Sequence, residues 1–185
     1  MLSSINWNID LKTITAIAAL LVAIHSCRES APPDNAGFPT QREVNRSMED
    51  INRRMSQEED AAIDRYIEQH AWSMNKTGTG LRYMIYKSGP EGPLAAEGQI
   101  ATVNYAVSLV DGTVVYSSDD QGKRSFLIGQ DNVESGIHEA IQYLKIGDKA
   151  HVILPSHLAH GLTGDNDKIP PRSTVIYDIE LLSLR

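Results

Sequence analysis

The spacing of hydrophobic positions changes along the chain, and each spacing predicts a different kind of segment. Residues 13–24 (TITAIAALLVAI) form one run without a charged side chain. In residues 41–71 the apolar side chains instead recur every three or four positions, which is the spacing of a helix face. From residue 80 onward they gather in short, partly alternating runs between turn residues, which indicates β-strands. The chain therefore divides into an apolar N-terminal segment, a helical segment and a β-rich segment.

The N-terminal segment is predicted to be a lipoprotein signal peptide. Its apolar run is shorter than the roughly 20 residues that a membrane-spanning helix needs, and it has the length of a signal-peptide core. Lys12 precedes the run, and residues 24–27 (IHSC) follow it with the only cysteine of the chain. This arrangement resembles a bacterial lipobox, so we expect residues 1–26 to be removed and Cys27 to be acylated. The alternative is that Cys27 is a buried free cysteine.

A linker and a helical arm are predicted next. Residues 27–40 hold three prolines and no apolar periodicity, which is typical of a flexible linker. Residues 56–59 (SQEE) have the form of a capping box, so the arm, residues 41–78, is expected to hold two helices or one kinked helix. Its narrow apolar stripe has to pack on the downstream domain, or else on a second copy or a partner through residues 41–71. The stripe consists of Val44, Met48, Ile51 and Met55, followed by Ile63, Tyr66, Ile67 and His70.

The β-rich segment is predicted to fold as an α+β domain. Asp111-Gly112 is a strong hairpin signal, and the apolar positions from Ile137 to Leu144 indicate one short helix. The expected architecture is a curved antiparallel β-sheet wrapped on that helix, with the helical arm N-terminal to it. Strands are expected over residues 81–87, 99–110, 113–117, 124–128, 149–154 and 173–184.

Composition narrows the class of protein. A chain of 185 residues with 41% hydrophobic and 22% charged side chains fits one soluble domain with appendages, and excludes wholesale disorder and a multi-span membrane protein. The formal net charge of −7 argues against nucleic-acid binding, which needs a positive surface. With one cysteine, neither an internal disulfide nor a set of cysteines for structural zinc is available.

Residues 79–185 resemble an FKBP-type peptidyl-prolyl isomerase domain. The order and spacing of several short motifs over about 105 residues carry the resemblance. Together with the lipobox and the helical arm, they resemble the gliding-motility-associated isomerase lipoproteins of Bacteroidota. The motifs are TGLRY at 79–83, VNY at 103–105, DG at 111–112, SS at 117–118, FLIG at 126–129, LKIGD at 144–148, AHG at 159–161 and IPPRSTV at 169–175, followed by YDIELL at 177–182.

The resemblance implies an apolar, largely aromatic pocket for a prolyl ring, with no cofactor and no metal. It assigns catalytic roles to Tyr105, Tyr116, Ile137, His160 and Tyr177. It assigns substrate contacts to Val115, Phe126, Val133, Glu134 and Ile169. The family has an aromatic residue and an aspartate at positions 115 and 116, and usually a tryptophan at 137 and a tyrosine at 160. Glu134 stands where an apolar residue contributes its backbone N–H.

These departures leave two functions open. The first is cis–trans isomerisation of prolyl bonds in exported proteins as they fold, by a lipid-anchored protein of the outer membrane that faces the periplasm. The alternative is a catalytically weak or inactive binding or chaperone module attached to a secretion or gliding-motility assembly. His151, His157 and His160 invite a metal site, but their predicted positions on a strand and a loop make it the less favoured interpretation. Residues 165–167 (DND) resemble a calcium loop without its later glutamate, and are expected to form a solvated turn.

Overall fold

The computed structural model describes residues 38–185, and the predicted signal peptide, Cys27 and most of the linker lie outside this range. The chain divides into two units, residues 1–47 and 48–185, with the boundary inside the first described helix. Within the described residues, no helix combines the length and apolar character needed to cross a bilayer.

Helix α2, Gln41–Gln69, is a single element, so of the two predicted alternatives the one with two separate helices is wrong. The capping box lies at its start instead. Thr40 N–H donates to Glu43 Oε2 at 2.8 Å, and Glu43 N–H donates to Thr40 Oγ1 at 3.3 Å. Glu59 was expected to cap a second helix. Its carboxylate instead accepts hydrogen bonds from Ser156 and Thr174 in the β-rich segment that begins at residue 80, called the β-domain below. The sequence form of a capping box recurs wherever a serine and a glutamate are spaced by three. In the second such pair the glutamate, Glu59, makes a tertiary contact instead of a cap.

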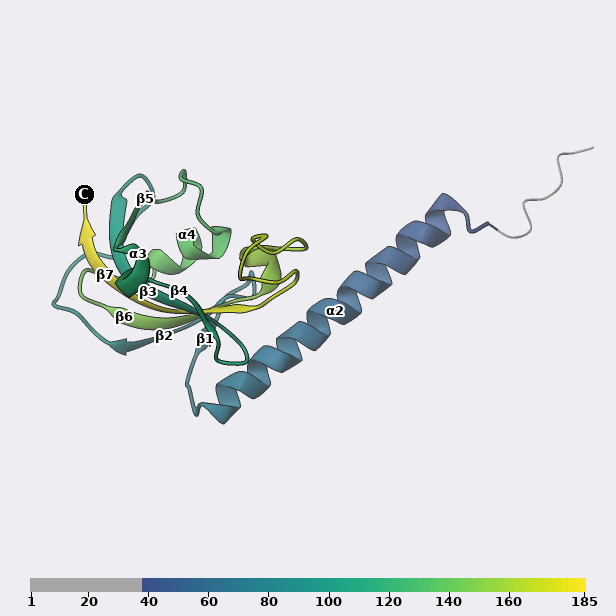
Figure 1. Cartoon of the computed structure of the whole chain (residues 1–185), viewed down its shortest axis with the longest axis horizontal. Helices are drawn as coiled ribbons and strands as arrows, with labels where there is room; N and C mark the ends of the chain where they lie inside the picture. The colour runs from purple at the N-terminus through teal and green to yellow at the C-terminus, as the bar shows by residue number, and fades with distance from the viewer. Residues whose placement is uncertain (1–37) are drawn as a thin grey trace, which may run out of the picture. The chain divides into compact units, whose positions relative to one another are not determined.

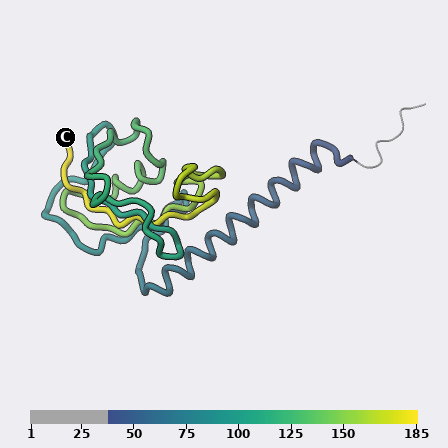
Figure 2. The backbone as a smooth tube through the Cα atoms, in the orientation of Figure 1, coloured from purple at the N-terminus to yellow at the C-terminus, as the bar shows by residue number. Residues whose placement is uncertain are grey.

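Seven strands form one antiparallel sheet in the order β1-β2-β6-β7-β3-β4, and β5 also pairs with β3. The C-terminal strand thus lies inside the sheet, as the trace in Figure 2 shows. In Figure 1 the sheet curves with helix α4 against one face, which confirms the predicted fold class. The bounds are β1 Asn75–Lys76, β2 Arg82–Lys87, β3 Ile100–Leu109, β4 Val114–Ser117, α3 Ser118–Gln121, β5 Arg124–Leu127, α4 Ser135–Ile141, β6 Lys149–Leu154, the 3₁₀ turn η2 Ser156–Leu158 and β7 Val175–Leu184.

The predicted hairpin at Asp111-Gly112 joins β3 and β4. Asp111 Oδ1 accepts from Thr113 N–H at 2.8 Å, and Gly112 has a φ of 87°, which a residue with a side chain adopts only under strain. Asp119 and Asp120 belong to the one-turn helix α3, in which the Ser117 side chain accepts from the Asp120 N–H. This helix matters because its last residue reaches the cleft described below.

Two apolar clusters lie within residues 48–185. The main core joins the sheet to α4. A second, smaller cluster packs Ile63 of α2 against Ile153 and Ile176, which contact it from β6 and β7. This part of α2 therefore packs on the downstream domain, one of the three partners considered for the stripe. The stripe residues nearer the start of unit 48–185 remain open, with Met48 at 55% exposure and Ile51 at 40%.

Charged side chains also hold α2 against strand β2, the η2 turn and Thr174, the residue before β7. Arg82 in β2 is 1% exposed, and its guanidinium donates to Asp60 Oδ1 at 3.0 Å and Asp64 Oδ1 at 3.1 Å on α2. Glu59 accepts from Ser156 N–H at 2.7 Å and from the Thr174 hydroxyl at 2.7 Å. A buried guanidinium without partners would be strongly destabilising, so these carboxylates are required where they stand.

Candidate functional site

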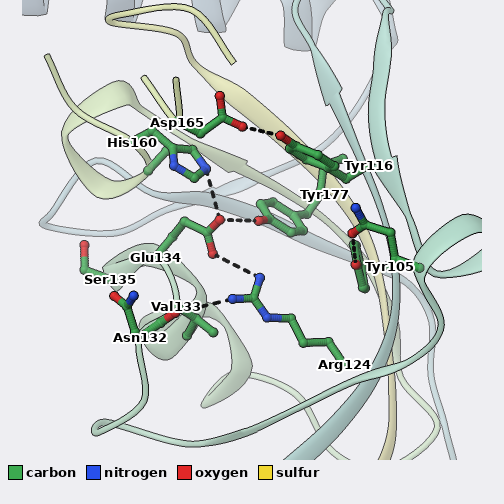
Figure 3. A pocket seen from close by; sticks show the side chains of 13 residues that line it. Tyr105, Tyr116, Arg124, Asn132, Val133, Glu134, Ser135, His160, Asp165 and Tyr177 are labelled. Atoms are coloured by element: carbon green, nitrogen blue, oxygen red, sulfur yellow. Dashed lines mark hydrogen bonds and ion pairs between the residues drawn. The ribbon is translucent and has the colours of Figure 1, made fainter. Parts of the chain in front are cut away.

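A cleft of about 440 Å³ opens at one end of the sheet. Seven segments of the chain meet around it: strands β3, β4 and β7, the end of α3, the start of β5, the segment leading into α4, and the loop after η2 (Figure 3). Its volume lies within the range typical of small-ligand sites. The lining residues are Tyr105, Val107, Tyr116, Gln121, Arg124, Asn132, Val133, Glu134, Ser135, Ala159, His160, Asp165 and Tyr177.

Two predicted tyrosines stand in the cleft with their hydroxyl groups held. Tyr177 on β7 is 5% exposed, and its hydroxyl donates to Glu134 Oε1 at 3.0 Å. Burial, together with the Glu134 charge, raises the pKa of Tyr177 well above its usual range. The Tyr105 hydroxyl on β3 donates to Gln121 Oε1 at 2.9 Å, at the end of α3. Both hydroxyl groups are therefore engaged within the protein, and the two rings form fixed walls of the cleft.

Glu134 brings a carboxylate into a pocket that was expected to be apolar. Its side chain is 10% exposed, and Oε1 lies 3.1 Å from His160 Nε2 in addition to the Tyr177 hydroxyl. The Arg124 guanidinium lies 4.0 Å from Oε2. Figure 3 shows the three side chains converging on this carboxylate. From the sequence, Glu134 was expected to contribute its backbone N–H, and the position of its side chain was not predicted.

A second carboxylate lies beside Tyr116, the position at which the family has an aspartate. The Tyr116 hydroxyl on β4 donates to Asp165 in the loop after η2, and to Asp167 Oδ2 at 3.2 Å. The hydrogen bond to Asp165 raises the pKa of Tyr116 to about 12. Burial alone would raise the pKa of Asp165, but the Tyr116 hydroxyl and two backbone N–H groups lower it to about 2. The cleft thus has a carboxylate beside position 116, supplied by the opposite loop instead of by residue 116 itself.

The predicted residues form two layers. Six line the cleft: Tyr105, Tyr116, Val133, Glu134, His160 and Tyr177. Four lie in the core next to it or beneath it: Val115, Phe126, Ile137 and Ile169. Phe126 and Ile137 stand under the cleft beside Val133 and Tyr177, where they form an apolar floor.

Seven lining residues were not predicted from the sequence, and three of them carry polar or charged groups that shape the site: Arg124, Gln121 and Asp165. The other four are Val107, Asn132, Ser135 and Ala159. Arg124 lies two positions before Phe126 on β5, so both side chains lie on the same face of the strand. That alternation was a usable signal for Arg124. The position of Gln121 depends on α3. That of Asp165 depends on the course of residues 155–174, the 20-residue segment between β6 and β7, which no local pattern specifies.

The three histidines considered for a metal site have separate roles. His151 stacks between Trp72 and Tyr86, with ring centroids at 4.2 and 4.4 Å, and burial lowers its pKa. His157 Nε2 lies 3.0 Å from the Thr79 carbonyl, whereas His160 lies beside Glu134. Among residues 38–185, no cluster of three metal-ligating side chains is found. The DND turn also lacks a site of this kind, because Asp165 is occupied by Tyr116 and by its own loop.

Comparisons with known proteins address the identity of this cleft. The family described as FKBP-type peptidyl-prolyl cis-trans isomerase matches residues 92–182. The FKBP-type 22 kDa peptidyl-prolyl cis-trans isomerase of Escherichia coli is 32% identical over 146 residues, which cover 77% of this chain and 69% of that protein. The chain belongs to the FKBP-type peptidyl-prolyl cis-trans isomerases.

Other members of the family extend the comparison. The isomerase Fkbp12 of Drosophila melanogaster is 35% identical over 106 residues, which cover 57% of this chain and 98% of that protein. A probable FkpA of Neisseria meningitidis is 39% identical, but the chain spans only 39% of its length. The crystal structure of FkpA from Escherichia coli matches with a TM-score of 0.60 at 26% identity, and covers 96% of this chain and 84% of that one.

Membership of the family confirms the isomerase expectation and does not favour the inactive binding module. The activity of an FKBP-type isomerase is rotation about the bond before proline in a polypeptide. The cleft suits this task, since it places two fixed aromatic rings and an apolar floor where a prolyl ring has to be held.

Proposed function

We propose that this FKBP-type isomerase acts on prolyl bonds of exported proteins from a lipid anchor on Cys27, in the outer membrane and facing the periplasm. The observation that carries the catalytic part is the cleft in which Tyr105 and Tyr177 stand over Phe126 and Ile137. The apolar run before Cys27 supports the anchor. The narrower resemblance to gliding-motility-associated lipoproteins supports clients from a secretion or motility assembly.

The chemistry needs no nucleophile. Rotation about the C–N bond faces a barrier of about 18–20 kcal/mol because amide resonance has to be broken. A planar amide separates more charge than a twisted one, so transfer from water to an apolar floor raises the planar ground state more. Contacts to the flanking residues then hold the twist, which is preferential binding of the transition state. The tyrosine hydroxyls are tied to Gln121 and Glu134, so the walls keep their shape while the peptide turns.

The test is isomerisation of short X-Pro-Phe peptides by the full chain in mild detergent. Uncatalysed exchange takes tens to hundreds of seconds at about 25 °C, so a modest acceleration is measurable. Tyr105→Ala and Tyr177→Ala should each lower kcat/KM about tenfold or more, because each removes a wall of the cleft. Tyr86→Ala is the matched control, since Tyr86 stacks on His151 outside the cleft. Folded protein without acceleration for any peptide would contradict the proposal.

The helical arm is proposed to pair with a second copy of the chain. Its open stripe includes Met48, Ile51 and Met55, with exposures of 55%, 40% and 39%. These residues share one helix face by their spacing. A paired arm would place two clefts on one membrane-anchored assembly, which raises the effective concentration of sites around a long client.

A further inference from the structure

The two oxygens of Glu134 have unequal surroundings. Oε1 meets the Tyr177 hydroxyl at 3.0 Å and His160 Nε2 at 3.1 Å. Oε2 is buried and has no hydrogen-bond partner among the described residues. The Arg124 guanidinium stands 4.0 Å from it, which is beyond hydrogen-bond distance. The Arg124 side chain is 44% exposed. Its second terminal guanidinium nitrogen, Nη2, donates to the Asn132 carbonyl at 3.4 Å. Arg124 is therefore solvated, whereas Glu134 retains an unused acceptor.

An unused buried acceptor favours a ligand that brings a donor. A buried oxygen without a partner is costly, and a hydrogen bond that involves a charged group is stronger than a neutral one. The cleft is lined by two carboxylates, Glu134 and Asp165, and by one guanidinium, that of Arg124. The charge of the lining therefore favours a cationic donor over a neutral one, and disfavours an anion.

We propose that Glu134 makes this isomerase selective for prolyl bonds flanked by lysine or arginine. This inference rests on the proposed function, since it names the substrate class of the same cleft. The prolyl ring occupies the apolar floor, and the neighbouring ammonium or guanidinium donates to Glu134 Oε2. Arg124, which lies at the exposed rim, turns toward solvent as the client cation enters. The apolar residue that the family has at position 134 would offer no such acceptor.

The experiment compares peptides that differ by one charge. Lysine, norleucine and glutamate are placed immediately before proline, and in a second series immediately after it, and kcat/KM is measured with the full chain. Norleucine matches the lysine stem without its charge, so the lysine-to-norleucine ratio reports the ion pair. In one of the two series we expect a ratio of about ten at low salt, falling as ionic strength rises. Glutamate is expected to be the poorest substrate of that series.

Three variants test whether the lysine preference depends on the Glu134 carboxylate. Glu134→Gln should bring the lysine-to-norleucine ratio close to one, because it removes the charge and keeps the shape. Arg124→Gln should raise the ratio, because it removes the competing cation. Glu91→Gln makes the same chemical change at an exposed position outside the cleft, and should leave the ratio unchanged. Circular dichroism verifies that each variant is folded.

The outcomes separate the inference from the function on which it rests. If wild-type protein accelerates lysine and norleucine peptides equally in both series, the selectivity is refuted and the isomerase stands. A lysine preference that survives Glu134→Gln refutes the role of Glu134. If no peptide is accelerated by folded protein, the proposed function fails, and the inference fails with it.

Discussion

At the scale of single residues, Tyr116 and Asp165 show how a departure from the family pattern is accommodated. Asp165 accepts from the Tyr116 hydroxyl and, at 2.9 and 2.8 Å, from the N–H groups of Asp167 and Ile169. These bonds hold its pKa at about 2 in the folded protein, below the ordinary 3.8. The ionised form thus stabilises the fold above about pH 4, and this contribution is lost as the pH falls toward 2.

Asp165→Asn is expected to lower the free energy of unfolding at pH 7 by about 1–2 kcal/mol, since the site is partly exposed and its charge is screened. The difference from wild type should shrink as the pH falls from about 4 to about 2. Urea denaturation at pH 7, 4 and 2.5 measures it, and Tyr116→Phe tests the same bond from the other side. A difference between Asp165→Asn and wild type that does not vary with pH would show that the carboxylate is not held in this way.

Residue identity predicted part of the cleft. The aromatic positions 105 and 177 stand in motifs of the family, and the valine at 133 follows from alignment between two motifs; all three line the cleft. Phe126 and Arg124 could not be separated by motif alone, since strand alternation puts both on one face. Their burial distinguishes the two side chains. Phe126 is buried, with its ring centroid 5.8 Å from that of His138, whereas the charged Arg124 side chain is 44% exposed to solvent. Side-chain direction at Glu134 depends on Tyr177 and His160, which are remote in sequence.

At the scale of elements, alternation and turn residues predicted the strands better than capping patterns predicted helix ends. The expected strand at 99–110 corresponds to β3, and that at 149–154 to β6. Both strands bury one face, and this burial produces the alternation of apolar positions along their sequences. The alternative of two separate helices divided at 56–59 was wrong, because a local capping pattern competes with tertiary contacts that the sequence does not display. Glu59 forms such contacts with Ser156 and Thr174.

The Glu59 contacts lead to a prediction about how α2 is attached. Glu59→Ala removes three hydrogen bonds, to Ser156 N–H at 2.7 Å, Ser156 Oγ at 3.0 Å and Thr174 Oγ1 at 2.7 Å. The free energy of unfolding should fall by about 1–3 kcal/mol, because the donors lose a charged acceptor. Glu58→Ala is the matched control at the neighbouring exposed position. Guanidinium denaturation monitored by circular dichroism compares the two, and equal losses would contradict the argument.

At the scale of the whole molecule, the open stripe of α2 predicts self-association. In a chain lacking residues 1–27, which has no acylation site, sedimentation should give a dimer that dissociates on dilution. Met48→Glu should shift the equilibrium to monomer, because it places a charge in the centre of an apolar contact. Gln57→Glu adds the same charge at an exposed position on the opposite side of the helix and should leave the dimer intact. A monomer at all concentrations in the unsubstituted chain would contradict the pairing.

The proposed lipid anchor would determine where two such clefts work. Cys27 follows the apolar run of residues 13–24 by three positions, and the predicted linker of residues 27–40 would separate it from the start of α2 at Gln41. Several acyl chains hold a protein at a bilayer far more firmly than one, so diacylation followed by loss of residues 1–26 would keep the isomerase at the membrane.

Cys27→Ala should abolish labelling by radioactive palmitate and leave the protein unprocessed. Ser26→Ala keeps the cysteine and should be labelled like wild type. Palmitate incorporation that persists in Cys27→Ala would refute the anchor, while the cleft and its isomerase chemistry would be unaffected, because they depend only on residues of the β-domain.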